Sequence, residues 1–235
     1  MSAWWLNWLG NKASLTAEQQ HRLDTWKSLP RIALDKPFNA TRYVVVDVET
    51  SGLNLMQDHL ISIGAVAVVN GQIALGESFY MVLQQETVSH KENILLHGIG
   101  GGAQTGGVPA ADALLAFLEY LGKDPLIAFH VTFDQTMIQR AIHQYLGVSF
   151  GHAWADMAYL MPAIYPSYAS RYRLLDDWIT HFNIHNDARH NALSDAMVTA
   201  QLFQIALSLV SKKKIADFAG LRDLEKMQRW VSGIS

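Results

Sequence analysis

The sequence contains no cysteine, which excludes disulfides, zinc–thiolate sites and cysteine nucleophiles. Any bound metal ion would have to use carboxylates and histidines, and oxygen-rich sites of this kind favour hard ions such as Mg²⁺ or Mn²⁺. Charged residues make up only 17% of the 235 residues, and half of the chain is hydrophobic. This balance is typical of a folded protein with one sizeable core and not of a disordered chain.

A strong positive charge is also absent, since the formal net charge is -3. A protein that only coats nucleic acid is usually basic, whereas an enzyme that meets phosphates through bound cations does not have to be. No apolar run approaches the ~20 residues of a membrane span. The N-terminus lacks a basic region followed by an apolar stretch, which disfavours a secretory signal. We therefore predict a cytoplasmic protein without a membrane span.

We expect the chain to consist of an N-terminal extension, a central domain and a C-terminal tail, at residues 1–40, 41–211 and 212–235. The extension is rich in tryptophan, at Trp4, Trp5 and Trp8, and a helix with a capping box should follow from Thr16. We expect the tryptophans to pack on the domain, and a docking or membrane-surface role is the alternative. In the tail, the apolar spacing of residues 215–231 predicts an amphipathic helix packed on the domain.

The central domain begins with strands and continues with strands and helices in alternation. Residues 43–48 read YVVVDV, a β-branched run suited to a strand that is buried on both faces. Asn70-Gly71 is a strong hairpin signal between two further strands. The predicted strands span residues 43–48, 60–69, 72–83 and 126–129. The predicted helices span residues 109–121, 132–146, 173–182 and 192–210. This order predicts an α/β fold with a mixed sheet flanked by helices.

Two acidic residues, Asp47 and Glu49, lie at the end of the first predicted strand. Side chains two apart in a strand point to the same face, and two adjacent buried anions are costly unless a cation lies between them. The spacing alone is not specific, because Asp223 and Glu225 share it. That second pair lies in a helical pattern, where such residues do not face each other, so we expect both to be solvated.

Two more segments carry acidic residues where elements join. Asp134 follows the second buried strand, where a helix begins, and sites in such sheets gather at strand ends. Asp195 lies in the first turns of a helix that begins near Ala192, and His190 lies in the preceding loop. Histidine suits a general base because its pKa lies near neutrality.

In this order and context, the three segments resemble the DEDDh exonucleases, the DnaQ-like family of the DNA polymerase III epsilon proofreading subunit. The resemblance covers about residues 41–210, and the three motifs correspond to residues 46–53, 128–134 and 190–195. The sister subfamily has a tyrosine at the position of Asn191, so the histidine subfamily is indicated. Val131 departs from the family, which usually has asparagine there.

The resemblance implies a ribonuclease H-like fold and the removal of nucleoside 5′-monophosphates from the 3′ end of DNA. It implies that two Mg²⁺ or Mn²⁺ ions, roughly 3.5–4 Å apart, are held by Asp47, Glu49, Asp134 and Asp195. In this scheme His190 is the general base. The substrate contacts implied by the resemblance are Thr50, Gly52, Leu53, His97 and Phe133.

Further positions match the family between the motifs. Asp156 resembles an acidic position that often precedes the penultimate helix. Three arginines become candidates for phosphate contact, although exposed arginines are more often simply solvated: Arg171, Arg173 and Arg189. After His97 the family often has threonine and an acidic residue, but this chain has three glycines, at residues 100–102, so we expect a more mobile loop.

The expected partner is nucleic acid with a free 3′ end, single-stranded or frayed, with a DNA polymerase as a candidate protein partner. A free-standing exonuclease is as consistent with the sequence as a proofreading subunit. Two other functions stay open. One is an RNA- or oligonucleotide-trimming 3′-5′ exoribonuclease, since a 2′-hydroxyl could be read by main chain. The other is a non-catalytic, polymerase-associated nucleic-acid-binding protein.

Overall fold

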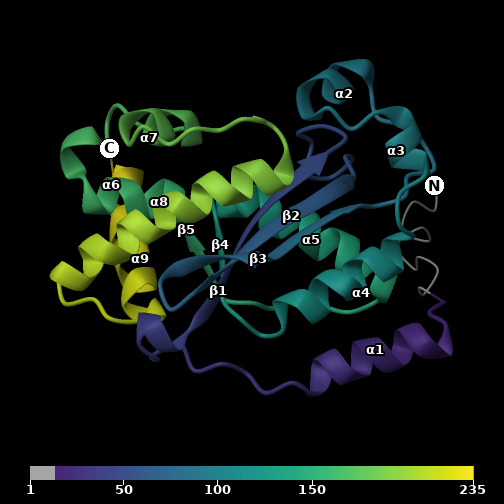
Figure 1. Cartoon of the computed structure of the whole chain (residues 1–235), viewed down its shortest axis with the longest axis horizontal. Helices are drawn as coiled ribbons and strands as arrows, with labels where there is room; N and C mark the ends of the chain where they lie inside the picture. The colour runs from purple at the N-terminus through teal and green to yellow at the C-terminus, as the bar shows by residue number, and fades with distance from the viewer. Residues whose placement is uncertain (1–13, 235) are drawn as a thin grey trace, which may run out of the picture.

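A mixed five-stranded sheet forms the centre of the computed structural model, which describes residues 14–234 (Figure 1). Its strands are β1 (Arg42–Thr50), β2 (Leu60–Val69), β3 (Gln72–Val82), β4 (Leu126–Ala128) and β5 (Trp154–Asp156). In space their order is β3-β2-β1-β4-β5. The first three strands form an antiparallel meander, and β4 and β5 continue the sheet in parallel with β1. The predicted mixed sheet is confirmed, whereas the short strand β5 was not predicted.

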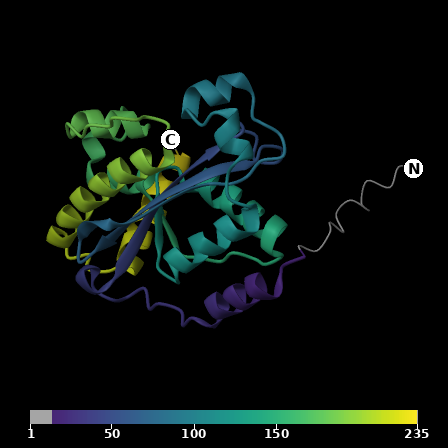
Figure 2. The ribbon, with the colours of Figure 1, turned by 45° about the vertical axis from the view of Figure 1, so that its right-hand side comes forward.

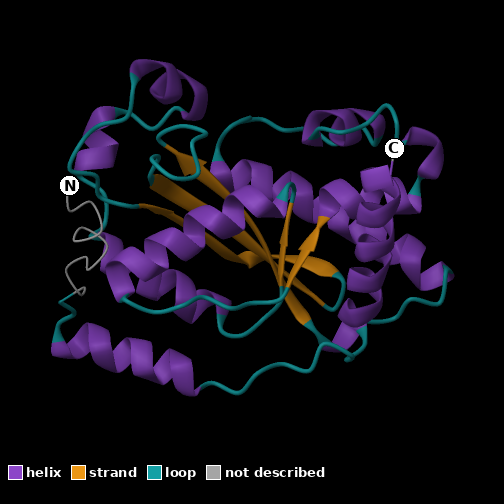
Figure 3. Ribbon diagram, turned by 180° about the vertical axis from the view of Figure 1, so that it is seen from behind, coloured by secondary structure: helices purple, strands orange, loops and turns teal. Residues whose placement is uncertain are grey.

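Helices cover both faces of the sheet (Figure 3). In the described residues they are α1 (Ala17–Ser28), α2 (Lys91–His97), α3 (Gly101–Thr105), α4 (Ala110–Leu121), α5 (Val131–Leu146), α6 (Met157–Ile164), α7 (Leu175–His181), α8 (Ala192–Lys212) and α9 (Phe218–Ile234), with the short 3-10 helices η2 (Phe38–Ala40) and η3 (Pro166–Tyr168). Strand β1 alternates between two apolar cores. Val44 and Val46 pack in one core with α4 and α5, and Tyr43 and Val45 pack in the other with α6 and α8.

Local sequence explains most element ends. Asn70 and Gly71 adopt positive φ angles of 54° and 70° between β2 and β3, as the predicted hairpin requires. Thr16 caps α1 in a reciprocal capping box with Gln19. The glycine run after His97 does not form an open loop, because Gly101 begins the short helix α3. That helix is fixed by Gln104, whose Nε2 donates to the Ile99 carbonyl at 2.8 Å.

The N-terminal helix α1 packs on α4 and lies apart from the C-terminal elements (Figure 2). Leu23 and Trp26 are buried in the core beneath α4, and the Trp26 Nε1 donates to the Gly122 carbonyl at 2.8 Å. Arg22 pairs with Glu119 on α4 at 2.7 Å. The predicted packing of Trp4, Trp5 and Trp8 concerns residues outside the described part of the chain.

Helix α8 is long and apolar enough to cross a membrane by length and composition, and it is the one such helix in the described part of the chain. The expectation that no apolar run approaches a span is therefore wrong for this helix. Its most apolar window is 56% buried inside the fold, and it packs along β1 and β2. We interpret it as a core helix.

Helix α9 packs on α6 and β5, as the amphipathic pattern predicted. Phe218 and Leu221 are fully buried. The prediction that both acids of the second pair are solvated is wrong for Glu225, which is only 9% exposed. Its Oε2 accepts a hydrogen bond from the Asp156 backbone at 3.1 Å, and its Oε1 pairs with Arg229 at 2.8 Å. Helical spacing places the two acids on different faces, and only the face of Glu225 turns inward.

Candidate active site

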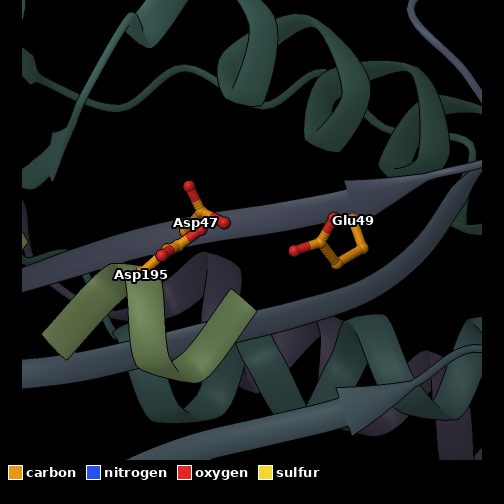
Figure 4. A group of neighbouring side chains, drawn as sticks. All are labelled: Asp47, Glu49 and Asp195. Atoms are coloured by element: carbon orange, nitrogen blue, oxygen red, sulfur yellow. The ribbon is translucent and has the colours of Figure 1, made fainter. Parts of the chain in front are cut away.

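Asp47 and Glu49 project from the C-terminal half of β1 (Figure 4). They lie two residues apart in a regular strand, so both side chains leave the same face of the sheet. Asp47 is partly exposed, and Glu49 is 9% exposed. The neighbouring side chains of β1 are apolar and buried, so few polar groups are available to neutralise the two carboxylates.

Asp195 reaches the same place from the first turn of α8. The residue that pairs with Asp47 across the β1–β2 ladder is Gly64. A Cβ atom at Gly64 would overlap the backbone of Ala192 and Leu193, so the missing side chain lets the start of α8 lie directly on the sheet. One carboxylate oxygen from each of Asp47, Glu49 and Asp195 lies within 4.8 Å of the other two.

Asp134 is the fourth predicted carboxylate, and it stands in the first turn of α5 with 4% exposure. It lies outside the tight group of three, but its charge acts on that group by raising the pKa of both Asp47 and Glu49. The turn before α5 is held by Asp156, whose two carboxylate oxygens accept the backbone N–H groups of His130 at 3.0 Å and Val131 at 3.2 Å.

Burial and mutual repulsion make these carboxyl groups hard to ionise. Burial raises the pKa of Glu49 to about 8, with further increases from the charges of Asp195 and Asp134. The pKa of Asp47 is raised well above its ordinary value, first by burial and then by the surrounding carboxylates. Burial also raises the pKa of Asp134, although backbone N–H groups, including that of Val48, oppose the shift. A bound cation would relieve this repulsion.

One buried oxygen atom in this group further supports the binding of a divalent cation. In the described part of the chain, the buried Oε1 of Glu49 has no hydrogen-bond partner, which is costly for an ionised carboxylate unless a ligand binds it. The donor set is all oxygen, as Mg²⁺ and Mn²⁺ prefer. The residues present therefore fit hard divalent ions.

Asp195 is held by three donors from the segment before α8. Its Oδ2 pairs with the Arg189 guanidinium and accepts the His190 backbone N–H at 3.1 Å. Its Oδ1 accepts the Asn186 amide at 2.6 Å. Arg189 also pairs with Asp176 on α7, with Nε 2.5 Å from Oδ1. This arginine is therefore engaged by two carboxylates and is not a freely solvated surface charge.

His190 occupies the loop position that the sequence predicted. Its φ angle is 61°, and its backbone is tied to Asp195. Asn191 follows as the N-cap of α8 and accepts the Ser194 backbone N–H at 3.1 Å. The His190 ring makes no hydrogen bond with any described residue, so its role as a base stays a prediction.

Three of the predicted substrate contacts lie at the end of β1 and in the loop that follows it. Thr50 Oγ1 donates to the Gly52 carbonyl at 2.7 Å, and a Cβ atom at Gly52 would overlap the Asp58 carboxylate. Asp58 also accepts the Ser51 hydroxyl at 2.7 Å. Leu53 is 84% exposed. The loop is therefore fixed at its base and presents an apolar side chain to solvent.

His97 and Phe133 have more buried surroundings. His97 is buried at the end of α2, where its Nδ1 accepts the Ile99 backbone N–H at 3.0 Å and burial lowers its pKa. Its Nε2 has no partner among the described residues. Helix α2 is joined to the loop after β1 by a hydrogen bond from Asn93 to the Ser51 carbonyl. Phe133 is partly buried against the core under α4 and α5.

Sequence reasoning missed two residues that shape the site, Gly64 and Asn186, and it missed the partners that hold Asp156. A glycine inside a β-branched strand marks a close backbone approach, so Gly64 could have been found. Asn186 has no spacing signal, because its bond to Asp195 depends on the loop conformation. The partners of Asp156 come from α9, 69 and 73 residues away, and only the tertiary fold brings them together.

Comparisons with known proteins identify the family. The model of the RNase_T exonuclease family matches residues 44–203. The DNA polymerase III subunit epsilon of Aquifex aeolicus is 28% identical over 78% of this chain and 90% of its own length. The PolC-type DNA polymerase III of Thermotoga petrophila is 25% identical over 82% of this chain. The chain spans only 14% of that polymerase.

Solved structures show the same fold at low sequence identity. Exonuclease I of E. coli in complex with a dT13 oligonucleotide has a TM-score of 0.62 and 15% identity, covering 73% of this chain and 42% of that one. Exonuclease X in complex with 5′ overhanging duplex DNA has a TM-score of 0.61 and 17% identity, covering 78% and 99%. Because the family model covers more than half of the sequence, the chain belongs to the RNase_T exonuclease family, the DnaQ-like group that includes the epsilon subunits of DNA polymerase III.

Proposed function

We propose that this protein is a metal-dependent 3′-5′ exonuclease of the DEDDh type that removes nucleoside 5′-monophosphates from the 3′ end of DNA. The convergence of Asp47, Glu49 and Asp195 within 4.8 Å carries the proposal. Asp134 supports it through its electrostatic effect on the group. Four ionised carboxylates repel one another, and a single guanidinium cannot balance their charge. Bound metal ions would relieve this repulsion.

Asp47, Glu49, Asp134 and Asp195 would hold two divalent ions, Mg²⁺ or Mn²⁺. When bound, such ions lower the pKa of an attacking water and stabilise the leaving 3′ oxygen. Asn186 and the His190 backbone fix the orientation of the Asp195 carboxylate. Gly64 on β2 lets the start of α8 approach the sheet beside Asp47.

His190 is the proposed base. A ring nitrogen of His190 would accept the proton of the water, because imidazole can take a proton near neutral pH. Its position directly before the cap of α8 supports this role, since its backbone is held against Asp195. The ring has no hydrogen-bond partner among the described residues and stays available for a reacting water.

The terminal nucleotide would bind beside the loop after β1. Thr50, Gly52 and Leu53 are the proposed contacts there, with backbone groups near the sugar and the exposed Leu53 against the base. The buried Nε2 of His97 lacks a partner among the described residues and would gain one from the substrate. Phe133 contributes through packing beneath the site.

The direct test is digestion of a 5′-labelled single-stranded DNA oligonucleotide with Mg²⁺ or Mn²⁺. Stepwise shortening from the 3′ end, with nucleoside 5′-monophosphates as products, is the expected result. Asp47→Asn and Asp195→Asn should each reduce cleavage by at least about 10²–10³-fold, the range seen when a group that stabilises transition-state charge is lost. Asp223→Asn, an exposed acid on α9, is the matched control and should cleave normally. Cleavage that survives both site substitutions would refute the assignment.

DNA is favoured over RNA by the relatives, which include polymerase III subunits, and by exonuclease structures that hold DNA. A matched RNA oligonucleotide in the same assay decides between them. The non-catalytic alternative is disfavoured because the sequence carries all four carboxylates and the histidine. Because relatives occur both as a separate epsilon subunit and within a polymerase chain, a DNA polymerase is the protein partner to test by co-purification.

The domain assignment also stays a proposal, with the exonuclease domain at residues 41–211, an N-terminal extension at 1–40 and a tail at 212–235. Helices α1 and α9 pack against this domain, so neither appendage stands alone. Expression of residues 41–211 followed by thermal unfolding would test whether the domain folds by itself.

A further inference from the structure

A cluster of tyrosines lies between α6 and α7, away from the residues used so far. It comprises Tyr165, Tyr168 and Tyr172 and packs on Trp178 and His181. The rings of Tyr168 and Tyr172 stack in parallel, with centroids 4.9 Å apart and an interplanar angle of 2°. All three tyrosines stay partly exposed. We call this cluster, together with Arg171 and Arg173, the tyrosine platform.

The platform carries two guanidinium groups, and neither of them forms an ion pair with a described residue. Residues 157–175 contain two arginines and no acidic residue. Arg171 and Arg173 are both exposed, and neither forms an ion pair with a described residue. In a chain with a net charge of -3, these two arginines lie beside exposed aromatic rings without an acidic partner, and the Arg171 guanidinium lies 5.8 Å from the centroid of the Tyr172 ring.

The nearby acids are already engaged. Asp176 pairs with Arg189, and Asp187 pairs with His185 at 2.9 Å. Asp177 accepts the backbone N–H groups at positions 173 and 174, both at 2.8 Å. None of these acids is paired with the platform's guanidinium groups, so the two cations remain available to a phosphate-bearing partner.

The platform lies next to the active site. Helix α7 follows it directly, and Asp176 in the first turn of α7 pairs with Arg189. Arg189 in turn pairs with the carboxylate of Asp195. Figures 1 and 2 both show α7 alongside α8. A strand whose 3′ end reached Asp195 could therefore continue over the platform.

We propose that the tyrosine platform binds single-stranded polynucleotide upstream of the 3′ end, so that the enzyme prefers strands of several nucleotides over the shortest substrates. This inference rests on the proposed exonuclease function. Exposed aromatic rings stack on bases without regard to sequence, and arginines pair with successive phosphates.

The test compares two substrates that differ only in the presence of an upstream strand. One is a 20-nucleotide DNA strand, longer than the roughly 4–16 nucleotides that an OB fold covers on a single strand, and the other is the p-nitrophenyl ester of thymidine 5′-monophosphate. The double variant Arg171→Gln/Arg173→Gln should raise KM on the strand about 10-fold, with an unchanged rate on the ester. Arg31→Gln, an exposed arginine of the N-terminal linker, is the control and should change neither.

Binding measured by fluorescence anisotropy in EDTA gives a second readout. Loss of two phosphate contacts on a single strand should reduce the slope of log K against log[salt] by about 1.4, at roughly 0.7 for each contact. Tyr168→Leu should weaken binding, whereas Tyr168→Phe, which keeps the ring, should not. If Tyr168→Leu fails to fold, the double variant of the two exposed arginines still tests the proposal.

Two failures are distinguishable. If wild type cleaves the ester and the strand, and the arginine double variant keeps the wild-type KM and salt slope, the platform is refuted and the exonuclease assignment stands. If wild type cleaves neither substrate, the proposed function fails. In that case, strand binding measured by anisotropy tests the platform without cleavage. Weaker binding by the arginine double variant than by wild type supports the platform, and equal binding refutes it.

Discussion

The Glu49 carboxyl lies among three other carboxyl groups with little water around it. Its pKa of about 8 in the folded protein compares with an ordinary value of 4.5. Between these two values the folded protein holds a proton that the unfolded chain releases, so this contribution to stability is complete below pH 4.5 and is lost as the pH rises through about 8. Asp47 shifts in the same direction.

We therefore expect the Tm of metal-free protein to fall by several degrees between about pH 5.5 and pH 8.5, because one pKa unit corresponds to about 1.4 kcal/mol and 1 kcal/mol to about 2–4 °C in a domain of this size. Mn²⁺ should reverse the fall at the higher pH, since the bound cation replaces the proton. Glu49→Gln should flatten the pH dependence in EDTA and abolish cleavage. A glutamine variant with the wild-type slope would show that other groups cause it.

Gly64 controls the position of Asp195 without contacting any ligand. Gly64→Ala places a methyl group against the backbone at the start of α8, and neither side can yield by rotating a side chain. We expect a loss of about 1–3 kcal/mol in unfolding free energy from overpacking, with weaker Mn²⁺ binding measured by calorimetry. Gly76→Ala on β3, where a Cβ atom meets nothing within 4 Å, should leave both quantities near wild type. Normal Mn²⁺ affinity in Gly64→Ala would show that α8 can shift without moving Asp195.

Helix α9 acts on the site through the turn between β4 and α5. Arg229 donates to Asp156 at 2.9 Å, and Asp156 accepts the two backbone N–H groups that open α5. Asp134 follows within the first turn of that helix. A change at α9 can therefore reach a proposed metal ligand through a chain of hydrogen bonds.

Arg229→Gln should weaken this chain and destabilise the protein by about 1–3 kcal/mol, the cost of leaving a buried charged acceptor short of a donor. It should also lower the affinity for Mn²⁺. Arg229→Lys should restore part of both, because a cation again faces Asp156. Lys226→Gln removes an exposed pair with Asp223 and is the control. If Arg229→Gln lowers Tm but leaves Mn²⁺ affinity intact, the helix has only a structural role.

The elements with strong local signals were predictable from sequence. The β-branched run of β1, the Asn70-Gly71 hairpin and the start of α8 at Ala192 all agree with the structure. Strand β5 was missed because three residues are too few to show a period, and its pairing with β4 is set by tertiary contacts. Glu225 was wrongly placed in solvent because helical spacing does not reveal which face meets the domain.

The same limit applies to the active site. Asp47 and Glu49 follow from strand alternation, and Asp195 follows from the position of a helix start. The tight approach of α8 to β2 at Gly64 and the engagement of Arg189 by Asp176 depend on packing between elements distant in sequence. Sequence could therefore name the carboxylates but could not show that Asp134 stands apart from the other three.

Helices α1 and α9, at the two ends of the described chain, differ in how they are connected to the candidate site. Helix α1 lies below α4 in Figure 1, away from the arrowhead of β1. Its main contribution is apolar, through Leu23 and Trp26. Helix α9 combines apolar burial with the polar network at Asp156. Loss of α1 should therefore lower stability alone, whereas loss of α9 should lower stability and also disturb the geometry of the site.

A chain that begins at residue 37 should lose several kcal/mol of unfolding free energy, because each large buried side chain contributes about 1.5–3 kcal/mol. Its Mn²⁺ affinity and its rate on the nucleotide ester should stay near wild type, since no residue of α1 contacts the carboxylates. A chain that ends at residue 212 should lose stability and Mn²⁺ affinity together, because it lacks both Glu225 and Arg229. Thermal unfolding and calorimetry on the two truncated chains test this contrast. Equal loss of metal affinity in both would mean that the site responds to overall stability and not to the hydrogen-bond chain from α9.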